Sequence, residues 1–192
     1  MIDKRTNPPD WSAIVLITLC LLICSAISGY TGELPDSHPS CITCKGSLSP
    51  QGRWCDNKNG TVTDMTNGLV WLKDAFWGEK YKFWADTSSG TNAADRAAQV
   101  KIGNSASLSD GSQEGAWRLP TLVELEALTS GTEAVRSNRL YWFTGVQSYY
   151  YWSSTTSAHS TGYAWVVGMH YGDFGDGNKT TDYYVWPVRG GQ

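Results

Sequence analysis

The residues best suited to chemistry in this sequence are hydroxyls, aromatic rings and histidines near its C-terminus. Residues 148–157 read SYYYWSSTTS, and His159 and His170 follow them. A Ser-His-Asp triad needs a serine held by a histidine that a carboxylate orients in turn, and no nucleophile-elbow sequence surrounds these serines. The segment therefore favours ligand binding over nucleophilic catalysis. We predict that the protein is not an enzyme.

The chain from residue 140 onward has the composition of a binding surface. It concentrates tyrosine with glycine, serine, threonine, asparagine and aspartate, and its cations are Lys179 and Arg189. Tyrosine gives large, rigid contacts at low entropic cost, and the small polar residues give adaptable hydrogen bonds, as in antibody loops. Such a surface suits a neutral glycan or a protein epitope. The predicted ligand-binding residues are Tyr149, Tyr150, His159, His170, Tyr171, Asp173, Phe174, Asp176, Asn178, Tyr183 and Trp186.

The net charge disfavours several classes of partner. The formal charge is -3 at pH 7, which gives no electrostatic attraction to nucleic acid or to anionic lipid and disfavours a polyanionic ligand. Association into a homo-oligomer is compatible with the sequence.

Three cysteines lie beyond the N-terminal apolar segment: Cys41, Cys44 and Cys55. The CITC motif could be a redox pair or half of a zinc site, but a second pair of ligands at metal spacing is missing. In an exported chain these cysteines predict one disulfide and one remaining cysteine, with the pairing left open.

Two acidic, glycine-containing stretches could bind calcium. They are DNKNG at residues 56–60, and DFGDGN at residues 173–178 together with Asp182. Neither has EF-hand spacing, and Asp, Gly and Asn are common in turns. We predict turns at both places and no required cofactor, with calcium as the alternative.

The N-terminus predicts export. Residues 11–28 are uncharged and mostly apolar, and Lys4 and Arg5 precede them. The run ends in Ala26-Ile27-Ser28, which places small residues at the cleavage positions of a signal peptide. The run is also just long enough to remain as a membrane anchor. The sequence thus predicts a signal peptide or anchor (1–28), a linker or irregular lobe rich in Gly, Pro and Ser (29–54), and one domain (55–192), at the cell surface or secreted.

Within the domain, local patterns predict two helices and several antiparallel strands. Residues 60–64 and 68–74 read as a hairpin, and residues 92–102 read as an Ala-rich helix. Thr121 and Glu124 form a capping-box pattern before Leu122, Leu125 and Leu128, which predicts a second helix with those leucines on one face.

The C-terminal part alternates in the manner of strands. Residues 162–172 predict a strand with Tyr163, Trp165, Val167, Met169 and Tyr171 on one side. Residues 183–190 predict a closing strand that lies at an edge or is bulged, because Pro187 cannot donate to a ladder. The fold class is α+β. The predicted core includes Trp71, Trp117, Trp152, Trp165, Leu122 and Leu125.

Three blocks in order resemble one family: residues 59–74, 117–128 and 151–191. They read NGTVTDMTNGLVWLKD, WRLPTLVELEAL, and YWSST followed by YAWVVGM and YVWPVRGG, and they are similar to the Lcl C-terminal domain, the C-terminal domain of the Legionella collagen-like adhesin. The resemblance covers about residues 53–191. It implies a C-type-lectin-like fold and a role in adhesion, including binding to sulfated glycans. Trp186 stands where this family often has arginine, so we predict that Trp186 is exposed.

The implied fold also occurs in two other classes of protein. Variable proteins of diversity-generating retroelements carry mutable codons near the C-terminus that yield Asn, Tyr, Ser, Thr, Asp, Gly and His. Residues 140–192 of this chain contain many of these residue types. Formylglycine-generating enzymes have a remotely similar fold, but their active cysteines have no counterpart because no cysteine follows Cys55. A diversified receptor-binding protein is therefore a second hypothesis, and an oxidase is a third.

Overall fold

The computed structural model describes residues 42–81, 84, 92–104, 107–130 and 142–190. Contacts divide the chain into Met1–Thr43 and Cys44–Gln192. The fold described below is that of the second unit. The predicted signal peptide or anchor lies outside the described residues, within which no helix is long and apolar enough to cross a membrane.

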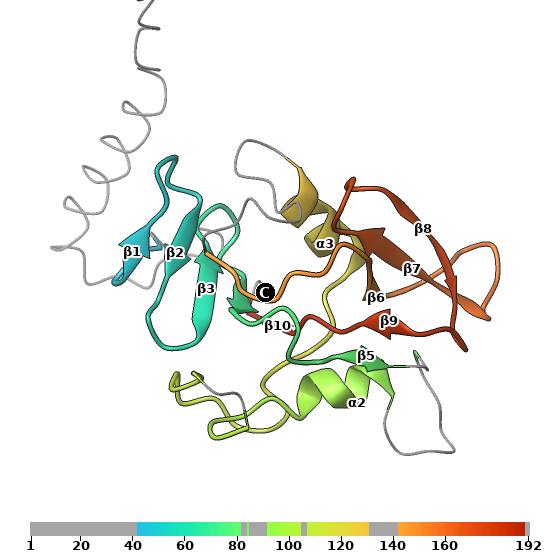
Figure 1. Ribbon diagram of the computed structural model, residues 1–192, viewed down its shortest axis with the longest axis horizontal. Coiled ribbons are helices and arrows are strands. Elements are labelled where there is room, and N and C mark those ends of the chain that lie inside the picture. Colours follow the sequence, from blue (N-terminus) through green and yellow to red (C-terminus); the bar gives the residue numbers. More distant parts are fainter. Residues whose placement is uncertain (1–41, 82–83, 85–91, 105–106, 131–141, 191–192) are drawn as a thin grey trace, which may run out of the picture. The chain divides into compact units, whose positions relative to one another are not determined.

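One five-stranded antiparallel sheet, sheet 1, contains the N-terminal strands and the last one (Figure 1). The predicted hairpin is confirmed, since β3 pairs with β4 and places Val62 opposite Trp71. The strand order is β1 (Ser47–Leu48), β2 (Trp54–Asp56), β3 (Thr61–Asp64), β4 (Val70–Leu72) and β10 (Val188–Arg189).

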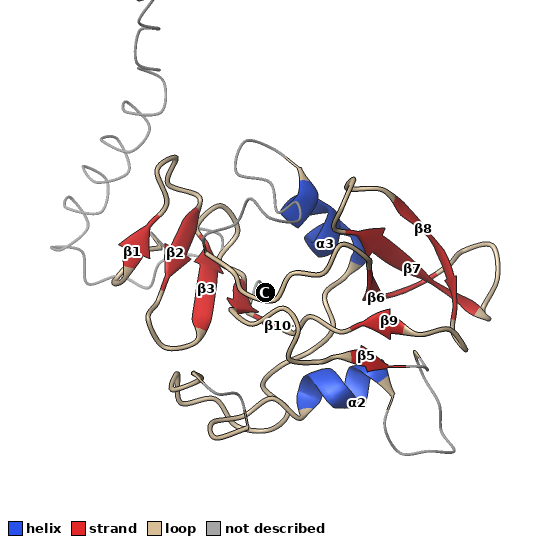
Figure 2. Ribbon diagram, in the orientation of Figure 1, coloured by secondary structure: helices blue, strands red, loops and turns tan. Residues whose placement is uncertain are grey.

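The second sheet, sheet 2, also has five strands (Figure 2). Neighbouring strands in this sheet are antiparallel, except that β6 and β9 are parallel to each other. Residues 173–178 were predicted as a turn, and this is wrong: most of them form the edge strand β8. The order is β5 (Lys80–Tyr81), β9 (Tyr183–Tyr184), β6 (Tyr150–Thr156), β7 (Tyr163–Gly168) and β8 (Phe174–Asn178).

The predicted closing strand is divided between the two sheets. Tyr183–Tyr184 pairs in sheet 2, and Val188–Arg189 pairs with β4 at the edge of sheet 1. Pro187 lies between them and has no N–H to donate, while its carbonyl accepts a hydrogen bond from Leu72 N at 3.1 Å. The predicted edge position is therefore confirmed for the second half of the segment.

Both predicted helices are present. Helix α2 (Ala93–Ala98) ends earlier than the predicted range of 92–102, and helix α3 (Leu122–Thr129) begins with the predicted capping box. The Glu124 carboxylate accepts from Thr121 N at 2.7 Å, and Thr121 Oγ1 accepts from Glu124 N at 3.3 Å. The helices make the domain α+β, as predicted.

Sheet 2 is covered on both faces because alternate side chains enter different hydrophobic clusters. Tyr151 and Val167 pack with Leu125 and Leu128 of α3, whereas the neighbouring Trp152 and Val166 pack with Ala93 and Ala97 of α2. Trp71, Trp117, Trp152 and Leu125 are buried, as predicted. Leu122 and Trp165 are only half-buried. Leu122 lies in the first helical turn, and Trp165 lies beside the edge strand.

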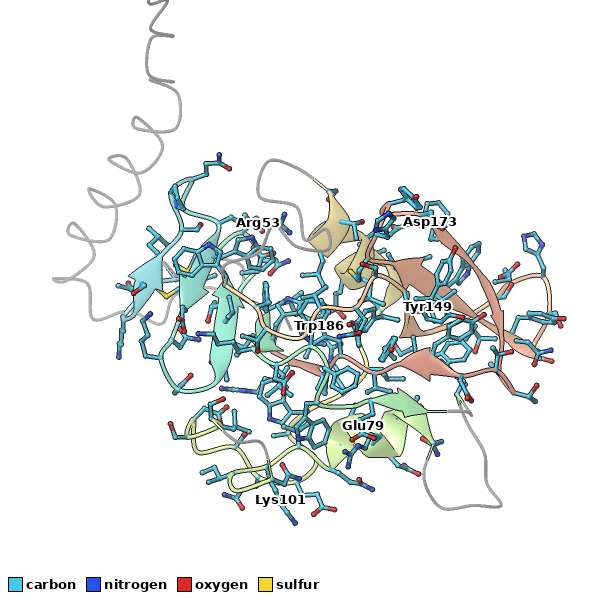
Figure 3. All side chains as sticks on the ribbon, in the orientation of Figure 1. Arg53, Glu79, Lys101, Tyr149, Asp173 and Trp186 are labelled. Atoms are coloured by element: carbon cyan, nitrogen blue, oxygen red, sulfur yellow. A yellow bond between two sulfur atoms is a disulfide. The ribbon has the colours of Figure 1, made fainter. Side chains whose placement is uncertain are left out.

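The predicted exposure of Trp186 is wrong. Its side chain is completely buried, near the centre of the domain in Figure 3. The ring makes edge-to-face contacts with Trp71 and Phe143, at centroid distances of 5.6 and 5.0 Å. Its Nε1 donates to the Leu72 carbonyl at 2.8 Å. A buried indole with a satisfied N–H belongs to the core, so Trp186 is removed from the candidate site.

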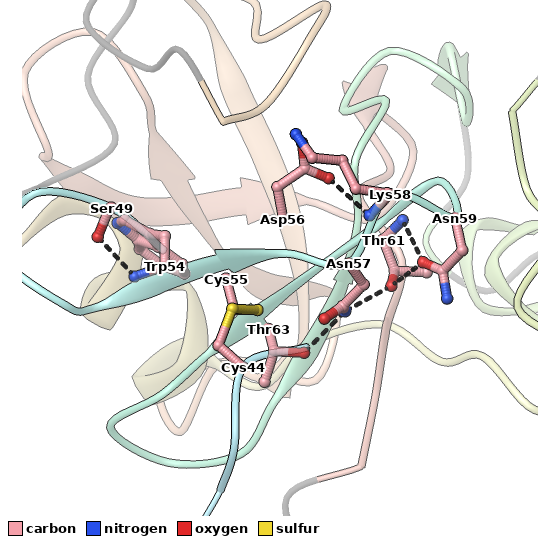
Figure 4. The surroundings of a disulfide bond; sticks show 10 residues. All are labelled: Cys44, Ser49, Trp54, Cys55, Asp56, Asn57, Lys58, Asn59, Thr61 and Thr63. Carbon is pink, nitrogen blue, oxygen red and sulfur yellow. Dashed lines mark hydrogen bonds and ion pairs between the residues drawn. A yellow bond between two sulfur atoms is a disulfide. The ribbon is translucent and has the colours of Figure 1, made fainter. Parts of the chain in front are cut away.

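Near the N-terminus of the unit, a disulfide joins Cys44 to Cys55 (Figure 4). This confirms the predicted disulfide and supplies its pairing, while Cys41 lies outside the described residues.

Asp56, which follows Cys55, is buried and accepts from Lys73 Nζ at 2.8 Å and Lys58 Nζ at 2.9 Å. Two ammonium groups thus occupy the carboxylate that a calcium ion would need in the 56–60 loop.

We expect Trp186→Ala to lower the free energy of unfolding by about 3 to 5 kcal/mol, because it empties a large core site and leaves the Leu72 carbonyl without its donor. Trp186→Phe should cost less, since most of the ring volume remains. Urea unfolding followed by fluorescence measures both. A stable alanine variant that had lost only ligand binding would contradict the core assignment.

Asp56 should make the domain acid-sensitive. Burial alone would raise the pKa of Asp56, but the ammonium groups of Lys73 and Lys58 outweigh it and hold the pKa at about 2, below the ordinary 3.8. A depressed folded pKa contributes stability above pH 3.8 that is lost as pH falls toward 2, by about 2 kcal/mol. Urea unfolding between pH 5 and 2 should show this loss in the wild type and a smaller loss in Asp56→Asn. Equal losses in the two proteins would contradict it.

Candidate functional site

Most of the predicted binding residues meet at one end of sheet 2, which we call the aromatic end. Here β6 begins, β7 ends and β8 begins, because Tyr150 pairs with Gly168 and Val167 pairs with Phe174. Figure 3 labels Tyr149 and Asp173 in this region. The aromatic end comprises Tyr149, Tyr150, His170, Tyr171, Asp173, Phe174 and Tyr183.

Three tyrosines form a compact cluster at this end. The ring of Tyr149 lies 5.7 Å from that of Tyr150 and 6.1 Å from that of Tyr183, and Tyr150 and Tyr183 are 6.0 Å apart. Tyr183 in turn stands edge-on against the buried Trp152 at 4.7 Å. Tyr149 is exposed and the other two are half-buried. The core therefore holds the inner rings and presents Tyr149 to solvent.

A hydrogen bond fixes Tyr150 to the turn between β7 and β8. Its hydroxyl donates to Asp173 Oδ2 at 2.5 Å, and this bond raises the pKa of Tyr150 above its ordinary value. Gly168 makes the approach possible, since a Cβ there would lie 2.5 Å from Asp173 Oδ1. Gly168 N also donates to the Asp173 carbonyl at 2.7 Å. Asp173 is thus held at two points: its carboxylate accepts from Tyr150, and its backbone carbonyl accepts from Gly168.

Strand β8 presents its predicted residues on the other face of sheet 2. Phe174, Asp176 and Asn178 lie opposite Val167, Trp165 and Tyr163 and share their face, while Gly175 and Gly177 point to the face of Tyr150. The ring of Phe174 is exposed and contacts the Trp165 ring at 5.8 Å. The predicted set is therefore divided between two faces that meet at the aromatic end and along the edge of β8.

The two histidines lie at opposite ends of the sheet. His170 and Tyr171 occupy the β7–β8 turn with ring centroids 4.0 Å apart, and Tyr171 is 75% exposed. His159 lies in the β6–β7 turn, where its N–H donates to Ser157 Oγ at 3.2 Å. Asn178 is also at that far end, and its side-chain oxygen accepts from Thr180. His159 and Asn178 do not join the aromatic end.

One exposed aromatic residue was missed by the sequence reading. Phe76 follows β4, is 44% exposed, and contacts the Tyr184 ring at 5.9 Å. Tyr184 contacts Tyr149 at 6.1 Å, so the buried Tyr184 ring links Phe76 to the tyrosine cluster. Asp74 Oδ1 accepts from Phe76 N at 3.0 Å and holds the turn. The sequence signal that could have indicated an ordered turn here is Asp74, two residues before Phe76.

A separate hollow of about 440 Å³ lies between the β1–β2 turn, the turn after β3 and the C-terminus of α3. Its basic residue Arg53 is already engaged with Asp64 and with the Ala127 and Ser130 carbonyls. A cation at the helix C-terminus satisfies unpaired carbonyls and stabilises the fold. Among the described residues, no group of three or more His, Cys, Asp or Glu side chains is placed to share a metal ion.

Comparison with known families identifies the domain. The family model described as the Lcl C-terminal domain matches residues 60–189, well over half of the chain. The chain belongs to the Lcl C-terminal domain family. The sequence resemblance is thus confirmed, and the Lcl match includes the whole aromatic end while leaving out the disulfide. No curated protein matches this Lcl member.

We expect Asp173→Asn to lower the pKa of Tyr150 toward its ordinary value of about 10, because the anionic acceptor that favours the neutral phenol is lost. Tyrosine Cζ chemical shifts followed by NMR against pH measure it. Asp176→Asn is the matched control, since it removes the same charge from the opposite face. If both variants titrated like the wild type, Asp173 would not be the cause of the raised pKa.

Proposed function

We propose that this protein is an exported, adhesin-like binding module that recognises a glycan or a protein ligand through the aromatic end of sheet 2. Membership of the Lcl C-terminal domain family supports an adhesin-like extracellular domain. The observation that carries the proposal is that exposed Tyr149, Tyr171 and Phe174 lie at the same end of sheet 2 as the Tyr150–Asp173 pair. The C-type-lectin-like fold and the location at the cell surface are parts of the same proposal.

The chemistry of this end suits stacking and hydrogen bonding. Exposed rings offer faces for sugar rings or apolar side chains, and Asp173 Oδ1 remains an acceptor for a ligand hydroxyl or amide. Because Tyr150 and Tyr183 are packed against the core, little side-chain entropy is lost on binding. A preformed aromatic surface of this kind functions as a recognition site.

Charge supports a ligand that is not a polyanion. Asp173 and Asp176 form no ion pair within the described residues. Lys179, which directly follows β8, is directed over the Trp84 ring at 4.0 Å and donates to Thr156. A sulfated chain would meet carboxylates here. A neutral glycan or a protein epitope fits better.

Binding rather than catalysis is also part of the proposal. The rival oxidase chemistry needs reactive thiols, and Cys44 and Cys55 are joined to each other, with Cys55 in strand β2 of sheet 1. A turnover screen with copper supplied would separate the two classes. Redox activity that depended on Cys41 or Cys44 would contradict the proposed binding function and favour an oxidase.

Tyr149→Ala and Phe174→Ala should each weaken ligand binding by about 1 to 3 kcal/mol without unfolding the domain, because exposed aromatic anchors dominate such interfaces. Ligands are first found on a glycan and protein array, and their affinities are then compared by biolayer interferometry. Tyr163→Ala is the matched control, since Tyr163 is also exposed but lies at the far end of β7. Loss of binding in the control alone would place the site elsewhere.

A further inference from the structure

The free edge of sheet 2 differs from the other sheet edges in the described part of the fold. The edge strands β1, β5 and β10 have two residues each, and such short strands give a neighbouring chain little to pair with. Strand β8 has five residues and pairs with β7 in five consecutive positions without a bulge. It contains no lysine and no proline. Shortness, a bulge, lysine and proline therefore do not protect β8, and its one charged residue is Asp176.

The phase of the β7–β8 ladder shows which backbone groups of β8 face outward. Gly168 N donates to the Asp173 carbonyl, and Lys179 N donates to the Gly162 carbonyl at 3.0 Å. Hydrogen-bonded pairs alternate along an antiparallel ladder, so Gly175 and Gly177 bond to β7 as well. The N–H and C=O groups of Phe174 and Asp176 then point away from β7. No strand lies beside them among the described residues (Figure 1).

Gly175 adds a second observation. A Cβ at Gly177 would come within 2.9 Å of Trp152 and Tyr183, so close packing explains that glycine. A Cβ at Gly175 would meet nothing within 4 Å, and its backbone is not in the left-handed region. Glycine weakens a strand and often marks a place where another backbone approaches closely. Contacts inside the described fold give no reason for glycine at position 175.

We propose that β8 is a docking edge that pairs with an extended, basic polypeptide segment of a partner protein, which adds a strand to sheet 2. Backbone groups of Phe174 and Asp176 supply the hydrogen bonds, and side chains on alternate positions supply the specificity. On one face the partner strand would meet both the Phe174 ring and the Asp176 carboxylate, which favours an apolar or aromatic residue and a Lys or Arg two positions apart. This inference rests on the proposed binding function and names its ligand class.

Charge favours such a partner over a second copy of this chain. The chain carries a net charge of -3, and Asp173 and Asp176 lie at or beside the edge. Two copies that paired with Asp176 opposite Asp176 would place like charges directly across from each other, which destabilises a strand pair. A basic segment would neutralise the same carboxylates.

The test removes one outward backbone donor without changing the inner ladder. Asp176→Pro eliminates the N–H that points away from β7, and the preceding Gly175 tolerates a following proline. Asp176→Ala is the matched control, because it removes the carboxylate but keeps the N–H. Circular dichroism and thermal unfolding establish that both variants fold. The probe is a phage-displayed library of random linear peptides selected on the full chain, followed by fluorescence anisotropy with the enriched peptides.

Enriched peptides should carry an apolar or aromatic residue and a Lys or Arg two positions apart, because Phe174 and Asp176 lie on one face. Asp176→Pro should weaken their binding at least about tenfold more than Asp176→Ala does. Equal binding to the two variants, or no peptide selected on the wild type, would overturn the strand-addition proposal. A wild type that sediments as a dimer and an Asp176→Pro variant that sediments as a monomer would assign the edge to self-association instead. If Tyr149→Ala or Phe174→Ala lost ligand binding while Asp176→Pro still bound the ligand, the proposed function would stand and this inference would be rejected.

Discussion

The passage of the C-terminal segment from sheet 2 to sheet 1 is the constraint on which the rest of the structure depends. Between β9 and β10 the chain runs through the buried core, where every polar group needs a partner. Leu72 supplies both partners: its carbonyl accepts from Trp186 Nε1, and its N–H donates to the Pro187 carbonyl. The proline at the crossing has no N–H that would remain unpaired. Leu72 thus satisfies the Trp186 indole and the Pro187 carbonyl where the chain passes from one sheet to the other.

This crossing determines which surfaces remain for function. Once β9 is placed beside β6, sheet 2 has α3 on one face and α2 on the other, and its central side chains are buried. What stays accessible is the aromatic end, where the strands turn, and the free edge of β8. Phe174 belongs to both surfaces, because its ring is exposed at the aromatic end and its backbone faces the free edge. The two proposed contacts are therefore continuous through one residue.

Local signals in the sequence predicted the elements that depend on near neighbours. The capping box at Thr121 and the hairpin of β3 and β4 arise from residues a few positions apart, and both were found. Trp186 was mispredicted because its partner Leu72 is 114 positions away in the chain. Strand β8 was read as a turn because Asp, Gly and Asn are turn residues, whereas the ladder offered by β7 overrides that preference. The tyrosines of the aromatic end were found from composition, but Phe76 required the fold.

The same division between buried and exposed residues bears on whether the C-terminal part could be diversified. Tyr149, Tyr171 and Phe174 project from the fold, so their substitution leaves the core unchanged. Gly168 and Gly177 cannot vary in this way, since a Cβ at either position would collide with neighbouring side chains. A retroelement that changed this segment would have to spare those glycines and Trp186 while varying the exposed positions between them. Within β8 itself it is Gly177 that close packing fixes, while a Cβ at Gly175 would meet nothing within 4 Å. The strand can therefore keep its ladder while its outward chemistry changes.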